Sequence, residues 1–440
     1  METRLKRLGL LTAIFLLAGL LLACNGVTGN PSSSTSGGTG SGGSSGSGGG
    51  GSGSGGGSGS GGGSGSSSSS TQFVYTANAH TFDVSGFQVG TGGVLSTVPG
   101  SPFSVPTAPP AINGPLALAH AGKYLLVESM SPDTATGIET YAIDSSSGAL
   151  TRVKMPAPPN TGNSFVASGP IVVDQSKMEA YFPGESISIL PNGSSGTPAL
   201  GAYAIASDGS LSALKGSPYA IPAEAVALDP LGRFLYDVNN GQISVILRNS
   251  DGSLGAMAPG SPMKLPGAPA STPYETCSFG GQAVASPAGN FLYVTCGGST
   301  SFNVFAVDSS GRLTSAQTMP AATPDEEFSG VALNPAGTLL IATQETLNSV
   351  TVFSVDPGSG KLAAVATAAA GTRPNSAAFD GSGAFAYVSN GSSLIAKDYF
   401  VPGSNNLSAY AVSQNGQLTP LPGSPYTTGS SPRSVTVIHP

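Results

Sequence analysis

Only 9% of the 440 residues are Asp, Glu, Lys or Arg, whereas about 25% is usual for a globular protein. Glycine (64 residues) and proline (35) are abundant and tryptophan is absent, which favours an all-β fold rich in tight turns. The net charge of −7 offers no basic surface for nucleic acid, so we expect no nucleic-acid partner.

The first 23 residues have the pattern of a secretory signal peptide. Basic side chains come first, and an apolar run follows from Leu8 to Leu22. This run is about 15 residues long, whereas a membrane-spanning helix needs roughly 20. The segment therefore predicts export, with an uncleaved anchor as the alternative.

The apolar run ends in Leu21-Leu22-Ala23-Cys24, which resembles the lipobox of bacterial lipoproteins. The resemblance implies cleavage before Cys24 and attachment of a diacylglycerol to its thiol, although Leu22 departs from the small residue usual at its position. Two or more acyl chains anchor a protein stably. We therefore expect a protein held on a bacterial membrane, facing the periplasm or the exterior; a plain signal peptide without lipid attachment is the alternative. In such lipoproteins Asn25 after the cysteine suggests the outer membrane, where the cell has one.

Residues 24–71 combine the lipidated cysteine with a tether. Every residue from Ser32 to Thr71 is Gly, Ser or Thr, so this segment has no apolar side chains to bury and is expected to stay disordered. A flexible coil of this length has a root-mean-square reach of about 35 Å. The folded domain is therefore expected to comprise residues 72–440.

Two sequence repeats predict the fold of this domain. A Gly-x-Leu step follows an alternating apolar strand seven times, about every 53 residues; its glycines are Gly93, Gly148, Gly209, Gly252, Gly311, Gly360 and Gly416. Glycine at this position suits a hairpin turn that needs a positive φ. The second repeat is a pair of apolar strands around a tight turn, as in residues 226–236, where Asp229-Pro230-Leu231-Gly232 fits a type I turn.

The second repeat has six complete copies and one split copy. Residues 433–440 supply a first strand with nothing after it, and residues 72–78 supply a second strand with nothing before it. Joining the two ends completes a seventh unit and removes the exposed sheet edges. The sequence therefore predicts an all-β, seven-bladed β-propeller with four antiparallel strands per blade, closed by pairing the C-terminal inner strand with the N-terminal strands.

This repeat pattern resembles that of the lactonase-type propellers, which include 6-phosphogluconolactonase-like and YVTN-repeat proteins. The resemblance is carried by residues 229–236, by the seven Gly-x-Leu steps and by the Gly-Ser-Pro-aromatic segments that begin at Gly100, Gly216 and Gly423. It implies a fold over residues 72–440 and lactone hydrolysis as an activity. Because the shared motifs are turns and core strands, it assigns no catalytic residue.

Loop lengths point to one face of the disc as the binding face. Long connections are expected at Ser129–Gly137, Met155–Ser168, Pro183–Leu200 and Gly391–Asn405. Aligning the inner strands brings one residue per blade to the channel mouth on this side, namely Gly114, Gly169, Glu224, Gln282, Ser329, Asn375 and Arg433. Arg373, His80 and the acidic run Asp325-Glu326-Glu327 are expected nearby, and His120 and His439 on the opposite face. A solvated rim with ordinary salt bridges is the alternative.

The remaining chemistry in the sequence is sparse. Cys277 and Cys296 flank one inner hairpin and either form a disulfide or remain free thiols. No phosphate loop, metal-ligand spacing or nucleophile elbow appears, so no cofactor or metal is expected.

Two functional hypotheses follow. The first, which the tether favours, is a monomeric module that binds a glycan, a small molecule or another envelope protein through its long-loop face. The second is a lactone hydrolase of the family type. Convergence of His, Glu and Arg at the channel mouth would favour the hydrolase.

Overall fold

The computed structural model describes residues 71–106, 117–129, 136–153, 163–167, 169–190, 193–239, 241–266, 282–295, 301–320, 328–391 and 403–439. All of the described residues lie in one compact unit, Ser70–Pro440. Cys24, Gly114, Cys277, Cys296 and the acidic run 325–327 lie outside them. No helix in the described part of the chain is long and apolar enough to cross a membrane.

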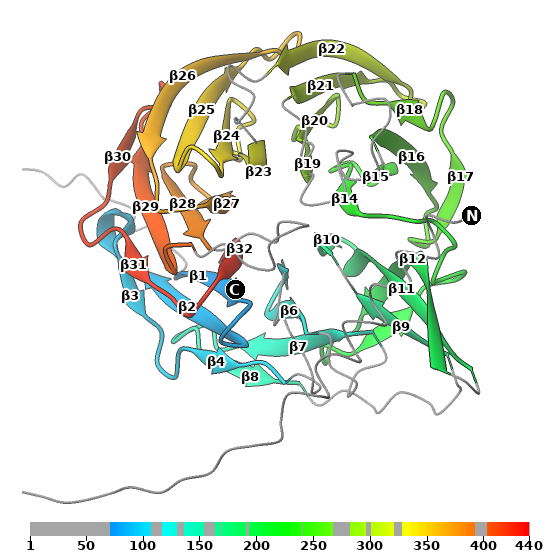
Figure 1. The fold of residues 1–440 in the computed structure, drawn as a ribbon, viewed down its shortest axis with the longest axis horizontal. Coiled ribbons are helices and arrows are strands. Elements are labelled where there is room, and N and C mark those ends of the chain that lie inside the picture. The colour runs from blue at the N-terminus through cyan, green and yellow to red at the C-terminus, as the bar shows by residue number, and fades with distance from the viewer. Residues whose placement is uncertain are drawn as a thin grey trace, which may run out of the picture. The chain divides into compact units, whose positions relative to one another are not determined.

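Seven antiparallel sheets form a ring of blades, each running from a central strand to the periphery (Figure 1). Blade 1 contains β5 (Leu118–Ala121), β6 (Tyr124–Glu128), β7 (Ile138–Ile143) and β8 (Leu150–Arg152). Blade 2 contains β10 (Val172–Asp174), β11 (Glu179–Leu190), β12 (Gly193–Ile205) and β13 (Leu211–Ala213), with β9 (Asn163–Ala167) added to β11. Blade 3 contains β14 (Ala225–Leu228), β15 (Phe234–Asn239), β16 (Gln242–Arg248) and β17 (Leu254–Met257), with β18 (Met263–Lys264) added to β16.

The next three blades repeat this order. Blade 4 contains β19 (Gln282–Ala285), β20 (Phe291–Thr295), β21 (Ser301–Val307) and β22 (Leu313–Pro320). Blade 5 contains β23 (Phe328–Leu333), β24 (Leu339–Gln344), β25 (Ser349–Val355) and β26 (Leu362–Ala369). Blade 6 contains β27 (Pro374–Phe379), β28 (Phe385–Asn390), β29 (Asn406–Val412) and β30 (Leu418–Pro420), with β31 (Tyr426–Thr427) added to β29.

Blade 7 joins the two ends of the domain, as the split repeat predicts. Its inner strand β32 (Pro432–Ile438) pairs with β1 (Gln72–Asn78), with Phe73 opposite Ile438 and Asn78 opposite Pro432. β2 (Asp83–Val89), the 3₁₀ turn η1 (Thr91–Gly93), β3 (Leu95–Thr97) and β4 (Phe103–Ser104) complete the blade. The seven-bladed, all-β prediction and its mode of closure are confirmed.

Blade 2 contradicts part of the loop prediction. Residues 183–200 and 155–168 were expected to be connecting loops, but β11 and β12 continue through the first range and β9 lies within the second. Gly184 pairs with both Ala199 of β12 and Ala167 of β9, so the three segments form a β-extension. Pairing on both sides of β11 outweighs the local preference of Pro183 and Gly184 to interrupt a strand.

The hydrophobic core lies between blades. Each of the seven clusters of buried apolar side chains draws its residues from two neighbouring blades. The Gly-x-Leu glycines take part in this packing, since Gly148 has φ +73° and a Cβ there would lie 2.4 Å from the Phe73 ring of the preceding blade. The Tyr75 hydroxyl donates to the Gly148 carbonyl, and Tyr387 donates likewise to Gly93. The repeat glycine is therefore required both by its turn and by the blade interface.

Candidate functional site

The candidate residues lie where the innermost strands begin and the second strands end, a region that we call the inner rim. Three of the aligned rim residues bond to the next blade. Gln282 Oε1 accepts from Val331 N at 3.1 Å, Ser329 Oγ donates to Pro374 O at 3.1 Å, and Asn375 Nδ2 donates to Pro432 O at 3.0 Å. The alignment placed these residues at the channel mouth, and the structure shows that Gln282, Ser329 and Asn375 link blades 4 to 7 in sequence.

Arg433 differs from these neighbours. Its side chain is partly buried, and its Nε and Nη2 atoms have almost no accessible surface and no hydrogen-bond partner among the described residues. Burial lowers the pKa of the guanidinium, as does Arg373, whereas Glu345 raises it. A buried donor without an acceptor is uncommon in native proteins and calls for an explanation. Arg433 is therefore the strongest single candidate for ligand contact on the rim.

Arg433 interacts electrostatically with ionisable groups from blades 5, 6 and 7. Arg373 Nη1 lies 2.7 Å from Glu345 Oε1, and both side chains are largely buried. His80, just after β1, is close enough for Arg433 to lower its pKa, although burial contributes more to that shift. The imidazole therefore stays neutral over more of the range near neutral pH than a free histidine would. Within the described residues, a Glu, two Arg and a His interact electrostatically across blades 5 to 7.

Backbone strain coincides with this cluster. Arg373 has φ +60° and Ser431 has φ +62°, and each directly precedes the proline that opens an inner strand. A left-handed conformation is unusual for a non-glycine residue, and a following proline disfavours helical backbone further. Arg373 N donates to Asn348 Oδ1 at 2.9 Å, and Ser431 N donates to Asn405 Oδ1 at 2.8 Å. Such strain, which costs on the order of 1–3 kcal/mol per residue, tends to gather at functional sites.

An acidic pair lies on blade 3. Glu224 N donates to Asp237 Oδ1 at 3.3 Å, and Asp237 is only 2% exposed. Burial raises the pKa of Asp237 to about 7, and the Glu224 carboxylate adds to that rise. Sequence reasoning placed Glu224 on the rim but missed Asp237. Its one signal was a charged residue inside the apolar strand Phe234–Asn239.

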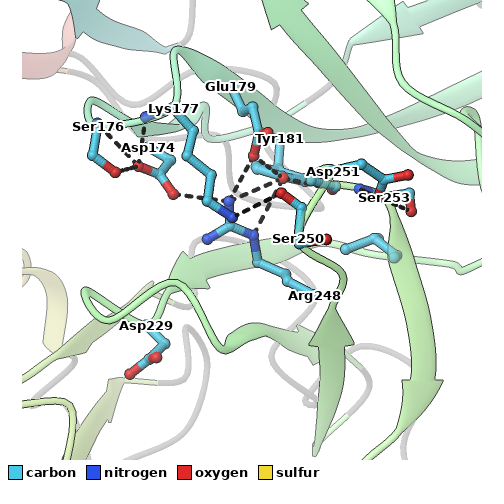
Figure 2. A network of polar contacts seen from close by, with 12 residues as sticks. Asp174, Ser176, Lys177, Glu179, Tyr181, Asp229, Arg248, Ser250, Asp251 and Ser253 are labelled. Carbon is cyan, nitrogen blue, oxygen red and sulfur yellow. Dashed lines mark hydrogen bonds and ion pairs between the residues drawn. The ribbon is translucent and has the colours of Figure 1, made fainter.

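The opposite face carries structural polar contacts. Arg248, whose side chain is fully buried, links blade 3 to blade 2 through Asp174 Oδ2 at 2.9 Å and Glu179 Oε2 at 2.8 Å (Figure 2). His120 Nδ1 lies 3.1 Å from Gln175 Nε2, and burial lowers the pKa of His120, as does His439. Within the described ranges, no three His, Cys, Asp or Glu side chains are grouped as a metal site.

Part of the propeller is similar to one known protein family. Residues 226–379 match the family model of lactonase, 7-bladed beta-propeller. The match runs from β14 of blade 3 to β27 of blade 6, which is less than half of the chain. The match includes Glu345 and Arg373 but ends before Arg433 and begins after His80. No curated protein matches the chain.

Solved structures support the same fold. A candidate 6-phosphogluconolactonase from Bacteroides uniformis has 16% identity and a TM-score of 0.60, over 84% of this chain and 100% of that one. A second from Bacteroides fragilis has 16% identity and a TM-score of 0.58, over 85% and 99%. The periplasmic gluconolactonase of Pseudomonas aeruginosa has 20% identity and a TM-score of 0.59, over 84% and 100%. At these identities the likeness concerns the fold.

Proposed function

We propose that the propeller hydrolyses a sugar lactone on the inner rim of blades 5 to 7. The observation that carries this proposal is the electrostatic grouping of Glu345, Arg373, Arg433 and His80, because it places a histidine with a lowered pKa near a largely buried ion pair and a guanidinium edge without an acceptor. The family match and the two kinds of lactonase among the similar structures favour hydrolysis over the binding module that the tether suggested.

The groups on the rim fit the chemistry of ester opening. Neutral His80 accepts a proton as water adds to the lactone carbonyl, and it returns the proton to the ring oxygen when the C–O bond breaks. Arg433 donates to the oxyanion that forms between these steps, which is the contribution that accelerates acyl transfer most. Glu345 pairs with Arg373 near His80 and Arg433 and balances the charge of Arg373. The product is an open hydroxy acid, which ionises to a carboxylate.

A lactone panel tests this proposal. The full-length protein is mixed at pH 7 with five- and six-membered sugar lactones, with and without a phosphate group, and acid release is followed against the spontaneous rate. We expect catalysed hydrolysis of at least one sugar lactone, and a loss of about 10²–10⁴-fold in His80→Asn because the base is removed. Binding of a lactone without turnover would instead support the binding module.

We further propose that lipidated Cys24 holds the enzyme on the membrane through the Gly/Ser-rich tether, which brings the rim to substrates in the envelope. The similar gluconolactonase of Pseudomonas aeruginosa is periplasmic, which agrees with an exported enzyme. Expression with a labelled fatty acid tests the anchor: the label is expected on the wild type, found with the membranes, and not on Cys24→Ser. Equal labelling of the two proteins would exclude lipidation at this cysteine.

A further inference from the structure

Other arginines of this chain show what the unpartnered edge of Arg433 is built to bind. Arg152 presents Nε and Nη2 to the two carboxylate oxygens of Glu139, both at 2.7 Å. Arg233 presents the same two atoms to Asp229, at 2.8 and 2.9 Å. This parallel pair of bonds is the geometry in which a guanidinium recognises a carboxylate. In Arg433 the same Nε–Nη2 edge has no acceptor among the described residues.

The charge around Arg433 fits one negative charge. Arg373 and Glu345 form an ion pair and cancel, and the lowered pKa of His80 favours its neutral form. The described groups therefore leave a net charge of about +1 on Arg433 itself. A monocarboxylate balances that charge, whereas a phosphate dianion would keep an uncompensated negative charge in a desolvated place. The geometry and the charge both select a carboxylate over a phosphate.

We infer that the Nε–Nη2 edge of Arg433 is a receptor for the carboxylate of an open, unphosphorylated sugar acid. The source of this ligand rests on the proposed function, because lactone hydrolysis at this point of the rim releases such an acid. The enzyme then retains its product, and the acid competes with the lactone. Arg433 as a whole is partly exposed, whereas its Nε–Nη2 edge has almost no accessible surface.

Calorimetric titration of the full-length protein with sodium gluconate tests the receptor without any turnover. Glucitol serves as the uncharged analogue and glucose 6-phosphate as the phosphate-bearing one. We expect gluconate to bind at least tenfold more tightly than either. Arg433→Lys keeps the positive charge but lacks the paired Nε and Nη2 donors, so it should weaken the binding of gluconate at least tenfold. Arg312→Lys, on an exposed turn of blade 4, should leave the affinity for gluconate unchanged.

Each result bears on the inference. Equal binding of gluconate and glucitol, tighter binding of glucose 6-phosphate, or full affinity in Arg433→Lys would overturn it. Thermal melting of each variant establishes that it is folded, and Arg433→Gln, which lacks the charge as well, should bind no better than Arg433→Lys. Gluconate binding without lactone hydrolysis would keep the receptor and refute the proposed function. Lactone hydrolysis without gluconate binding would keep the proposed function and refute the receptor.

Discussion

Replacing Arg248 with methionine is expected to lower the free energy of unfolding by about 3–5 kcal/mol at pH 7, because it strips two buried carboxylates of their shared cation. Arg248 bonds to Asp174 and Glu179 across the interface of blades 2 and 3, and its Nε lies 3.2 Å from the Tyr181 hydroxyl (Figure 2). Each carboxylate belongs to a side chain exposed by only 8–11%. Denaturant unfolding, monitored by circular dichroism, measures the loss.

The pH dependence of this loss identifies its cause. Burial alone would raise the pKa of Asp174, but hydrogen bonds from Ser176 and Arg248 outweigh it and the net shift is downward. The stabilisation is therefore present above the unfolded pKa of about 4 and disappears as the pH falls through the lower folded value. The difference between Arg248→Met and the wild type should shrink below pH 4. Arg312→Met, on an exposed turn, should change stability by less than about 0.5 kcal/mol. A loss of the same size at all pH values would indicate lost packing instead.

Replacing Asp237 with asparagine is expected to stabilise the protein at pH 8, by on the order of 2–4 kcal/mol. In the folded state the pKa of this carboxyl is raised to about 7, chiefly by burial, whereas the unfolded chain ionises near its ordinary value. Between about pH 4 and pH 7 the unfolded state loses its proton first, so wild-type stability falls as the pH rises through this window. Asparagine keeps an acceptor for Glu224 N and never ionises.

The gain should be small at pH 4 and reach its full size above pH 7. Asp208 provides the matched comparison, because it lies in an exposed turn where hydrogen bonds from Ser210 lower its pKa. Asp208→Asn should give no stabilisation at any pH. If Asp237→Asn destabilises the protein at pH 8, the buried carboxylate makes favourable contacts there and the expected gain in stability is wrong. Glu224 and Asp237 would then be the next pair to examine for a catalytic role.

The repeats predicted the fold because each one encodes a unit that is stable only against its neighbours. All seven Gly-x-Leu glycines have a positive φ, and the two chain ends meet in blade 7 as the split repeat requires. The extension of blade 2 was not predictable from local signals. Pro183, Gly184 and Pro198 read as breakers, but pairing with β9 and β12 supplies their backbone partners.

The site could be predicted only in part. Strand register placed Arg433 on the rim, and chain position added Arg373 and His80 nearby. Register alone could not separate Arg433 from Gln282 or Asn375, because the difference lies in which of them bonds to the next blade. Glu345 was missed because it lies in a turn of blade 5 and meets Arg373 only through the packing of blade 6 against it.

The most direct test of the account is the kcat/KM for hydrolysis of glucono-1,5-lactone by the wild type and by Arg433→Lys, compared at equal folded concentration and pH 7. The account predicts hydrolysis above the spontaneous rate, and a loss of about 10²–10³-fold in Arg433→Lys, because the lysine loses the paired donors aimed at the oxyanion. The control Arg312→Lys should retain the wild-type value. A wild-type rate no higher than the spontaneous one, or equal values for all three proteins, would contradict it.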